Sequence, residues 1–408
     1  MSVSPRIEIG EMEMKMPQHL ESHMAQSAAT TWSMGDKIHG LDEQAPLTGH
    51  QSVLRVLVLM RGTTVPASRF RVQQWLPHLE RRGIEVTVRP AYGDAYNRMT
   101  NTALGPAYKL WCSLKRLPQL VDAHRFDVVV IQKPTLPFSA LPEVVASWKN
   151  PRLVFDVDDA VYAGEGGAME ERRQAVFEAI VERCEHVICG NVHLAQAVGK
   201  AAPTTVIPTV VDTDLYRPSL YRRGEETLTI GWMGTAANFD SLEMIAEPLR
   251  RLARRPDVEV ELVSNARFEP LAGVGGVIQK RWSAGREVVD LQGFDIGVMP
   301  LVDTEVTRGK CGFKAIQYMA VGVPVVASPV GVNAEVVGQK ESVAGGVMAC
   351  DSEAFEAQLE ALIDDGQRRR RLGAQGRQRV EERYSIAAVV DRYVEVLRGV
   401  GSQVGAAG

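Results

Sequence analysis

The sequence predicts an α/β fold built from two doubly wound parallel sheets. Short apolar runs rich in branched residues recur along the chain, helical patterns separate them, and the alternation stops near residue 212 and restarts near residue 227. Strands that are buried on both faces read as continuous apolar runs, and the helices between them cover a parallel sheet on both sides. A length of 408 residues fits two domains with appendages.

The first 52 residues differ from the rest of the chain. They contain six of the 14 methionines and four of the eight histidines, mixed with polar residues. No helical or strand periodicity is sustained there. We therefore expect residues 1–52 to form a disordered or weakly ordered extension.

The first sheet is expected within residues 53–212. Its first strand is Leu54–Met60, and a helix with apolar residues from Phe70 to Leu79 follows. Gly83 ends that helix and precedes the strand Ile84–Val88. The remaining strands of this sheet are predicted at residues 126–131, 153–156, 186–190 and 205–208.

The second sheet follows a polar stretch that contains Pro218 and Gly224 and is typical of a linker. Its strands are predicted at residues 228–231, 258–263, 274–279, 295–299 and 323–327, and its helices at 242–254, 313–321 and 353–364. We expect this second domain over residues 213–384, and a C-terminal helix and tail over residues 385–408. Because ligands bind at the carboxyl ends of such strands, the two sheet edges are expected to face each other across a cleft.

Composition excludes several classes of protein. The formal charge of −4, from 46 basic and 50 acidic residues, argues against a dedicated nucleic-acid binder. No run of 18 apolar residues is long enough to cross a membrane. The five cysteines are scattered without a CxxC pair, which favours reduced thiols, and no secretory signal is visible. These features predict a soluble cytoplasmic enzyme.

The strongest chemical signal begins at Arg308. Gly309 and Gly312 allow backbone amides to approach an anion closely, and a helix N-terminus follows. Arg308, Lys310 and Lys314 add three cations around the same point. This pattern predicts a site for a diphosphate that needs no metal. The alternative is a basic helix start exposed to solvent.

The run from Lys310 to Gly331 resembles the donor-binding segment of group 1 (family 4) glycosyltransferases of the GT-B fold. Met319–Val326 matches the family pattern Met-Ala-x-Gly-x-Pro-Val-Val. Two acidic residues eight apart precede that pattern in the family, but the equivalent positions here are Gly309 and Gln317. The chain is more similar to a branch whose loop reads Gly-Lys-x-x-x-Lys. The amide of Gln317 offers a donor and an acceptor to a ribose hydroxyl.

The resemblance extends over roughly residues 53–400. Ile230–Thr235 is similar to the first strand and glycine loop of the donor domain, so Gly234 and Thr235 are expected beside the donor phosphate. Ile207–Pro218 resembles the crossing between the domains. The helix at 385–397 resembles the one that returns to the first domain.

The resemblance implies an enzyme that transfers a sugar from a nucleotide diphosphate sugar to an acceptor hydroxyl, with retention and without metal or cofactor. The acceptor would be a glycan, a lipid-linked molecule or a small molecule. The alternative is a non-catalytic nucleotide-sugar-binding or scaffold protein, which the missing acidic pair favours. A dinucleotide-dependent oxidoreductase is disfavoured because no strand is followed by G-x-G-x-x-G.

A further candidate is the sequence Asp156-Val-Asp-Asp159, which follows an apolar strand. Asp158 and Asp159 are assigned to orienting acceptor hydroxyls or stabilising the transition state. The alternative is that one of them caps a helix beginning near Val161. In the loop from Thr63 to Arg71, Ser68, Arg69 and Arg71 have either a ligand contact or an ordinary structural role.

The stretch Tyr108–Leu117 has Leu110, Trp111, Leu114 and Leu117 at helical spacing beside lysine and arginine residues. A basic amphipathic helix with tryptophan suits peripheral contact with an anionic membrane. That contact would lie on the inner membrane face and would suit a lipid-linked acceptor. Packing of the apolar residues into the core is the simpler interpretation.

Overall fold

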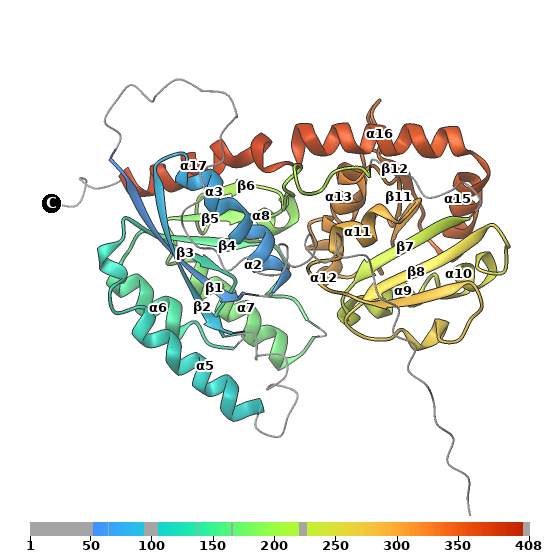
Figure 1. Cartoon of the computed structure of the whole chain (residues 1–408). Coiled ribbons are helices and arrows are strands. Elements are labelled where there is room, and N and C mark those ends of the chain that lie inside the picture. Colours follow the sequence, from blue (N-terminus) through green and yellow to red (C-terminus); the bar gives the residue numbers. More distant parts are fainter. Residues whose placement is uncertain are drawn as a thin grey trace, which may run out of the picture. The chain divides into compact units, whose positions relative to one another are not determined.

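The computed structural model describes residues 52–63, 65–93, 105–136, 138–164, 166–219 and 227–402. The predicted N-terminal extension therefore lies outside the described residues up to position 51, as do most of the expected linker and the last six residues. Residues 51–408 form one compact unit. Within it the chain forms two parallel six-stranded sheets (Figure 1), as the sequence predicts.

The first sheet has the strand order β2-β1-β3-β4-β5-β6, and each neighbouring pair is parallel. Its central strands are buried along their whole length, which explains their continuous apolar sequences. The strands are β1 (Leu54–Gly62), β2 (Ile84–Tyr92), β3 (Val128–Gln132), β4 (Leu153–Val157), β5 (His186–Cys189) and β6 (Thr204–Val206).

Helices connect these strands. The helix predicted from Phe70 to Leu79 is instead broken into two, because Pro77 has no N–H group to continue the turn before it. The described α-helices of this half are α2 (Pro66–Arg71), α3 (Leu76–Glu80), α5 (Gly105–Gln119), α6 (Leu141–Lys149), α7 (Ala168–Val181) and α8 (Val192–Val198).

The second sheet has the order β12-β11-β10-β7-β8-β9 and is also parallel throughout. Its strands are β7 (Leu228–Gly234), β8 (Val258–Ser264), β9 (Val277–Arg281), β10 (Ile296–Met299), β11 (Val325–Ala327) and β12 (Gly346–Met348). The helices packed around it are α9 (Phe239–Glu243), α10 (Ala246–Leu252), α11 (Glu287–Gln292), α12 (Glu305–Arg308), α13 (Phe313–Ala320), α14 (Asn333–Val337), α15 (Ser352–Asp364) and α16 (Gly366–Arg383).

The chain crosses between the two sheets twice at the same place. On the outward crossing, Val211 bonds to Tyr384 and Ile386 through its backbone groups. The chain then returns along α17 (Ile386–Ser402), whose apolar face packs on β1 and β3 (Figure 1). The predicted C-terminal helix therefore packs on the first sheet. We refer below to residues 54–211 as the first half and to residues 227–383 as the second half.

In the described part of the chain no helix is long and apolar enough to span a membrane.

Candidate functional site

The segment that carries the strongest sequence signal lies between β10 and α13. Thr304 caps the short helix α12, and residues 309–314, which we call the 309–314 loop, connect α12 to the first turn of α13. Gly312 has a φ of 65°, a left-handed conformation that favours glycine. No hydrogen bond among the described residues uses the backbone N–H groups of residues 313–315. These groups are free to bind an anion.

Lys310 and Lys314 lie beside the end of β7. The Lys310 Nζ atom donates to Asn238 Oδ1 at 2.9 Å, and Lys314 Nζ lies 5.7 Å from the centre of the Trp232 ring. A Cβ atom on Gly234 would stand 2.7 Å from the Lys314 Cε atom, so only glycine lets the strand end approach this closely. The structure thus brings the two predicted lysines together with predicted Gly234.

The charge of Lys314 is poorly compensated. Burial, with the nearby positive charge of Lys310, lowers the pKa of Lys314 to about 7, and Asp159 offsets this only in part. No ion pair to this lysine occurs among the described residues. A bound polyanion would supply the missing negative charge.

Asp158 and Asp159 face these lysines from the carboxyl end of β4. Lys133 Nζ lies 3.0 Å from Asp158 Oδ1 and also bonds to Asp159. Burial by itself lowers the pKa of Lys133, but the two carboxylates outweigh it and raise that pKa. For Asp159, desolvation acts to raise the pKa, whereas Lys133, and then Lys310 and Lys314, lower it below the usual range. The cluster is therefore a charged set drawn from both halves.

The helix-cap alternative for these two aspartates is wrong. Residues 159–164 contain a bend and a turn but no helix, and the next helix, α7, begins only at Ala168 after Gly167. Both aspartates instead form ion pairs with Lys133. Among the described residues, no three His, Cys, Asp or Glu side chains are grouped to hold a metal ion.

A buried carboxylate, Glu287 at the start of α11, receives four donors. Its Oε1 atom accepts from Gln317 Nε2 at 3.0 Å and from the hydroxyl of Tyr216. Its Oε2 atom accepts from Arg69 Nη1 at 2.8 Å and from Trp282 Nε1 at 3.0 Å. One of the two N–H groups of the Gln317 amide is thus engaged with Glu287. Its carbonyl oxygen makes no hydrogen bond among the described residues and can meet a ligand.

Four other candidates make contacts with neighbouring protein groups in this arrangement. Arg308 pairs with Asp303 at 2.7 Å and is half-exposed, so it is not grouped with the two lysines. Arg71 forms a buried two-bond contact with Asp156, and Ser68 donates weakly to Gln132. Thr235 accepts a hydrogen bond from Asn238 at 3.1 Å, which keeps it next to Lys310.

Sequence reasoning missed Lys133 and Glu287. Lys133 directly follows β3, at the same sheet edge as Asp158, so the rule that ligands gather at carboxyl ends of strands could have identified it. It also has a φ of 64°, which is unusual for a lysine. Glu287 had no local signal, because its partners lie at positions 69, 216, 282 and 317.

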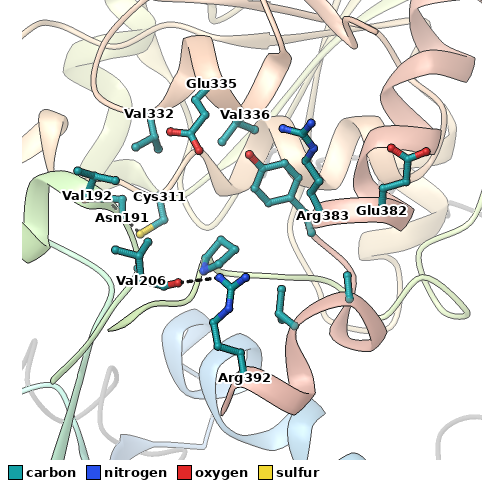
Figure 2. A pocket seen from close by; sticks show the side chains of 15 residues that line it. Asn191, Val192, Val206, Cys311, Val332, Glu335, Val336, Glu382, Arg383 and Arg392 are labelled. Carbon is teal, nitrogen blue, oxygen red and sulfur yellow. Dashed lines mark hydrogen bonds between the residues drawn. The ribbon is translucent and has the colours of Figure 1, made fainter. Parts of the chain in front are cut away.

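A cavity of about 320 Å³ lies between the two halves. Asn191 and Val206 line it from the first half, Cys311 and Val336 from the second, and Arg383 and Arg392 from the returning helices (Figure 2). Neither Lys310 nor Lys314 is part of its lining. It is therefore separate from the lysine cluster and shares only Cys311 with the 309–314 loop.

Comparison with known proteins agrees with this architecture. Residues 227–365 match the family described as "Glycosyl transferases group 1", and this region contains the whole 309–314 loop. The second half of the chain is thus similar to the group 1 glycosyl transferases. The two sheets together have the GT-B fold of the solved structures described below.

A curated relative of this chain is an MMP α-(1→4)-mannosyltransferase of Mycolicibacterium hassiacum. The two are 28% identical over 212 residues, which is 49% of this chain and 49% of the relative. The matched segment therefore spans about half the length of that enzyme.

Solved structures extend the similarity in fold to most of the chain. HepE of Anabaena, in complex with UDP and glucose, has a TM-score of 0.63 at 17% identity and covers 85% of this chain and 99% of its own. Sucrose-phosphate synthase of Thermosynechococcus elongatus has a TM-score of 0.61 at 16% identity, covering 85% and 99%. At these identities the likeness concerns the fold.

Proposed function

We propose that this protein transfers a sugar from a nucleotide diphosphate sugar to an acceptor hydroxyl. The observation that carries the proposal is the pair Lys310 and Lys314 at the start of α13, beside Gly234 and without a carboxylate that neutralises them both. A diphosphate provides the charge that this position lacks. The family match over residues 227–365 and the UDP complex of HepE support the same donor class.

In the proposed reaction, the glycosidic bond to the diphosphate breaks and negative charge grows on the leaving phosphate oxygen. The two ammonium groups and the free N–H groups of α13 stabilise that charge, which is where electrostatic catalysis acts. These groups supply the positive charge without a metal ion. We further propose retention of the anomeric configuration, in line with the family resemblance.

The nucleoside would lie near Gln317. The carbonyl oxygen of Gln317, whose amide nitrogen donates to Glu287, would accept a hydrogen bond from a ribose hydroxyl. An amide would then act as the acceptor at a position where the family resemblance implies a carboxylate.

On the acceptor side, Asp158 and Asp159 would orient the attacking hydroxyl. Lys133 pairs with both carboxylates and holds them in a fixed position opposite the two donor lysines, and it lowers the pKa of Asp159. A glycan, a lipid-linked molecule or a small molecule with a free hydroxyl is the proposed acceptor class.

The test starts with a thermal-shift screen of nucleotide sugars, because a ligand of the folded state raises its apparent stability. The best donor is then incubated with candidate acceptors, and nucleoside diphosphate release is measured. Asp158→Asn should lower turnover more than donor affinity. Donor binding without turnover for any acceptor class would favour the alternative, a non-catalytic nucleotide-sugar-binding protein. Failure of every nucleotide sugar to bind would reject both functions.

We also propose peripheral contact with the inner face of an anionic membrane through α5 and α6. Trp111 and Leu114 on α5 are 51% and 54% exposed, so the expected packing of these residues into the core is wrong. Trp148 at the end of α6 is 76% exposed. Lys115, which stacks on Trp111, and Lys149 add positive charge to this face. Exposed tryptophan beside lysine suits an anionic lipid interface.

Co-sedimentation with vesicles tests this contact. The protein should pellet with vesicles that contain phosphatidylglycerol and remain in solution with pure phosphatidylcholine. Trp111→Ser combined with Trp148→Ser should reduce the pelleted fraction several-fold, whereas substitution of exposed Val289 on α11 should leave it unchanged. If the double tryptophan variant and the Val289 variant pellet to the same extent, α5 and α6 do not form the membrane-binding face.

A further inference from the structure

Asn191 connects the two halves of the chain at the 309–314 loop. It is the N-cap of α8, where its Oδ1 atom accepts from the backbone N–H of Leu194 at 2.8 Å. Its Nδ2 atom donates to the carbonyl oxygens of Gly309 at 2.9 Å and Lys310 at 3.2 Å. The residue is only 3% exposed. A single amide therefore caps a helix in the first half and binds the loop in the second.

The two carbonyl groups lie at the end of α12, where the last carbonyls of a helix have no partner within it. In a trans peptide the carbonyl and the following N–H point in opposite directions. Binding of both carbonyls by Asn191 thus directs the N–H of Cys311 away from the first half. It also fixes the backbone just before the left-handed Gly312 and the first turn of α13.

Close packing next to the 309–314 loop also connects the two halves of the chain. A Cβ atom on Gly190 would lie 2.4 Å from the Cys311 Sγ atom, and this Sγ atom lies 3.1 Å from the carbonyl oxygen of Asp158. Burial raises the pKa of the Cys311 thiol, which therefore stays protonated and donates to that oxygen. Through this hydrogen bond, the backbone of Asp158 on the acceptor side is connected to the 309–314 loop, which contains Lys310.

We propose that Asn191 is a positioning residue for the nucleotide diphosphate, an inference that rests on the proposed function. Its amide holds the 309–314 loop in the shape that presents Lys310, Lys314 and the N–H groups of α13. In the structure, the 309–314 loop adopts this shape while it is in contact with the first half. Nucleotide affinity therefore depends on a residue that does not belong to the donor-binding half.

Three variants separate the two roles of Asn191. Asn191→Ser and Asn191→Asp keep a side-chain oxygen that can cap α8, but neither can donate to both loop carbonyls. Asn191→Ala loses the cap as well. Affinity for UDP, GDP, ADP and CDP is measured by titration calorimetry, and the unfolding midpoint is measured without nucleotide.

The expected result is a loss of affinity of about 5- to 20-fold in all three variants for the diphosphate that the wild type binds best, since each loses two hydrogen bonds. Asn191→Ser should leave the unfolding midpoint nearly unchanged. Asn191→Ala loses the cap, and Asn191→Asp places a buried carboxylate against two carbonyl oxygens, so both should lower the midpoint. With the donor found by thermal shift, the donor KM should rise by a similar factor while the acceptor KM stays constant.

Two results would overturn the inference, and they are distinguishable. If the wild type binds a diphosphate and the serine and aspartate variants bind it equally well, Asn191 only caps α8 and the proposed function stands. If the wild type binds none of the four diphosphates, the proposed function fails, and the positioning role fails with it.

Discussion

Gly309 packs directly against Ala160. A Cβ atom at position 309 would lie 2.5 Å from the Ala160 Cβ atom and 2.9 Å from its backbone nitrogen. Ala160 follows Asp159, so the first half of the chain occupies the space beside Gly309, a position where the family resemblance implies an acidic residue. The negative charge next to Lys310 and Lys314 comes instead from Asp159.

This contact predicts that restoring the family residue will not improve the enzyme. Gly309→Glu should separate Ala160 from the loop and lower both nucleotide affinity and turnover by tenfold or more, on the order of the 1.4 kcal/mol that a factor of ten represents. Gly309→Ala, which adds only the clashing Cβ atom, should show part of the same loss. Calorimetry and product release measure both effects. Higher turnover in Gly309→Glu would mean that the position accepts a carboxylate.

Lys133 should be essential to the charge balance of the acceptor side. Lys133→Met leaves Asp158 and Asp159 without their cation, which costs about 3–5 kcal/mol of stability, as for other broken buried pairs. A carboxyl whose pKa is lowered on folding stabilises the protein above the ordinary aspartate pKa of about 3.9 and loses that effect as the pH falls. Chemical denaturation between pH 3 and 7 measures the difference. On acidification, the free energy of unfolding should fall less in the Lys133→Met variant than in the wild type. Equal slopes of this free energy against pH in the two proteins would exclude this role for Lys133.

Lys314 should take up a proton when the donor binds. Its pKa of about 7 leaves it mostly neutral at pH 8, and a bound diphosphate favours the charged form. Calorimetric titration with a nucleotide sugar in buffers of different ionisation enthalpy should therefore report uptake of about 0.9 proton at pH 8 and about 0.1 at pH 6. A nucleotide sugar is used because its diphosphate does not itself titrate near pH 7. The Lys314→Met variant is the control, and uptake that persists in it would assign the proton to another group.

Arg71 should stabilise the fold without taking part in binding. Its guanidinium donates to both Asp156 oxygens, at 2.9 and 3.1 Å, and to the carbonyl of Ile207. Arg71→Met leaves a buried carboxylate unpaired and should cost about 3–5 kcal/mol, whereas the double variant with Asp156→Leu should recover part of that loss. Denaturant unfolding measures both. A loss of nucleotide affinity in a stably folded double variant would contradict the purely structural role.

The strands could be predicted from sequence because burial on both faces leaves a continuous apolar run. The predicted strand at 295–299 corresponds to β10, Ile296–Met299. β12 was not predicted, since Gly346–Met348 is three residues long and follows another glycine. The predicted helix at 242–254 is interrupted between α9 and α10. Short elements and breaks within helices depend on tertiary packing, which local sequence does not encode.

The candidate site was predictable only where its residues are close in sequence. Lys310 and Lys314 belong to one local pattern and lie together in the structure. The contacts of Asn191 with positions 309 and 310 join residues more than a hundred positions apart, and no periodicity indicates them. The role of Gln317 as a hydrogen-bonding group for the donor stays a prediction, and its contact with Glu287, at the start of another helix, has no signal in the local sequence.

The most direct test of the account is the affinity of a nucleoside diphosphate for the wild type and for Lys310→Ala and Lys314→Ala, measured by titration calorimetry without added metal. Each substitution removes a charge-assisted contact and should weaken binding by roughly 1–3 kcal/mol. Arg308→Ala is the matched control, because Arg308 pairs with Asp303 and should leave the affinity unchanged. Unchanged affinity in both lysine variants would contradict the assignment of the diphosphate to the start of α13.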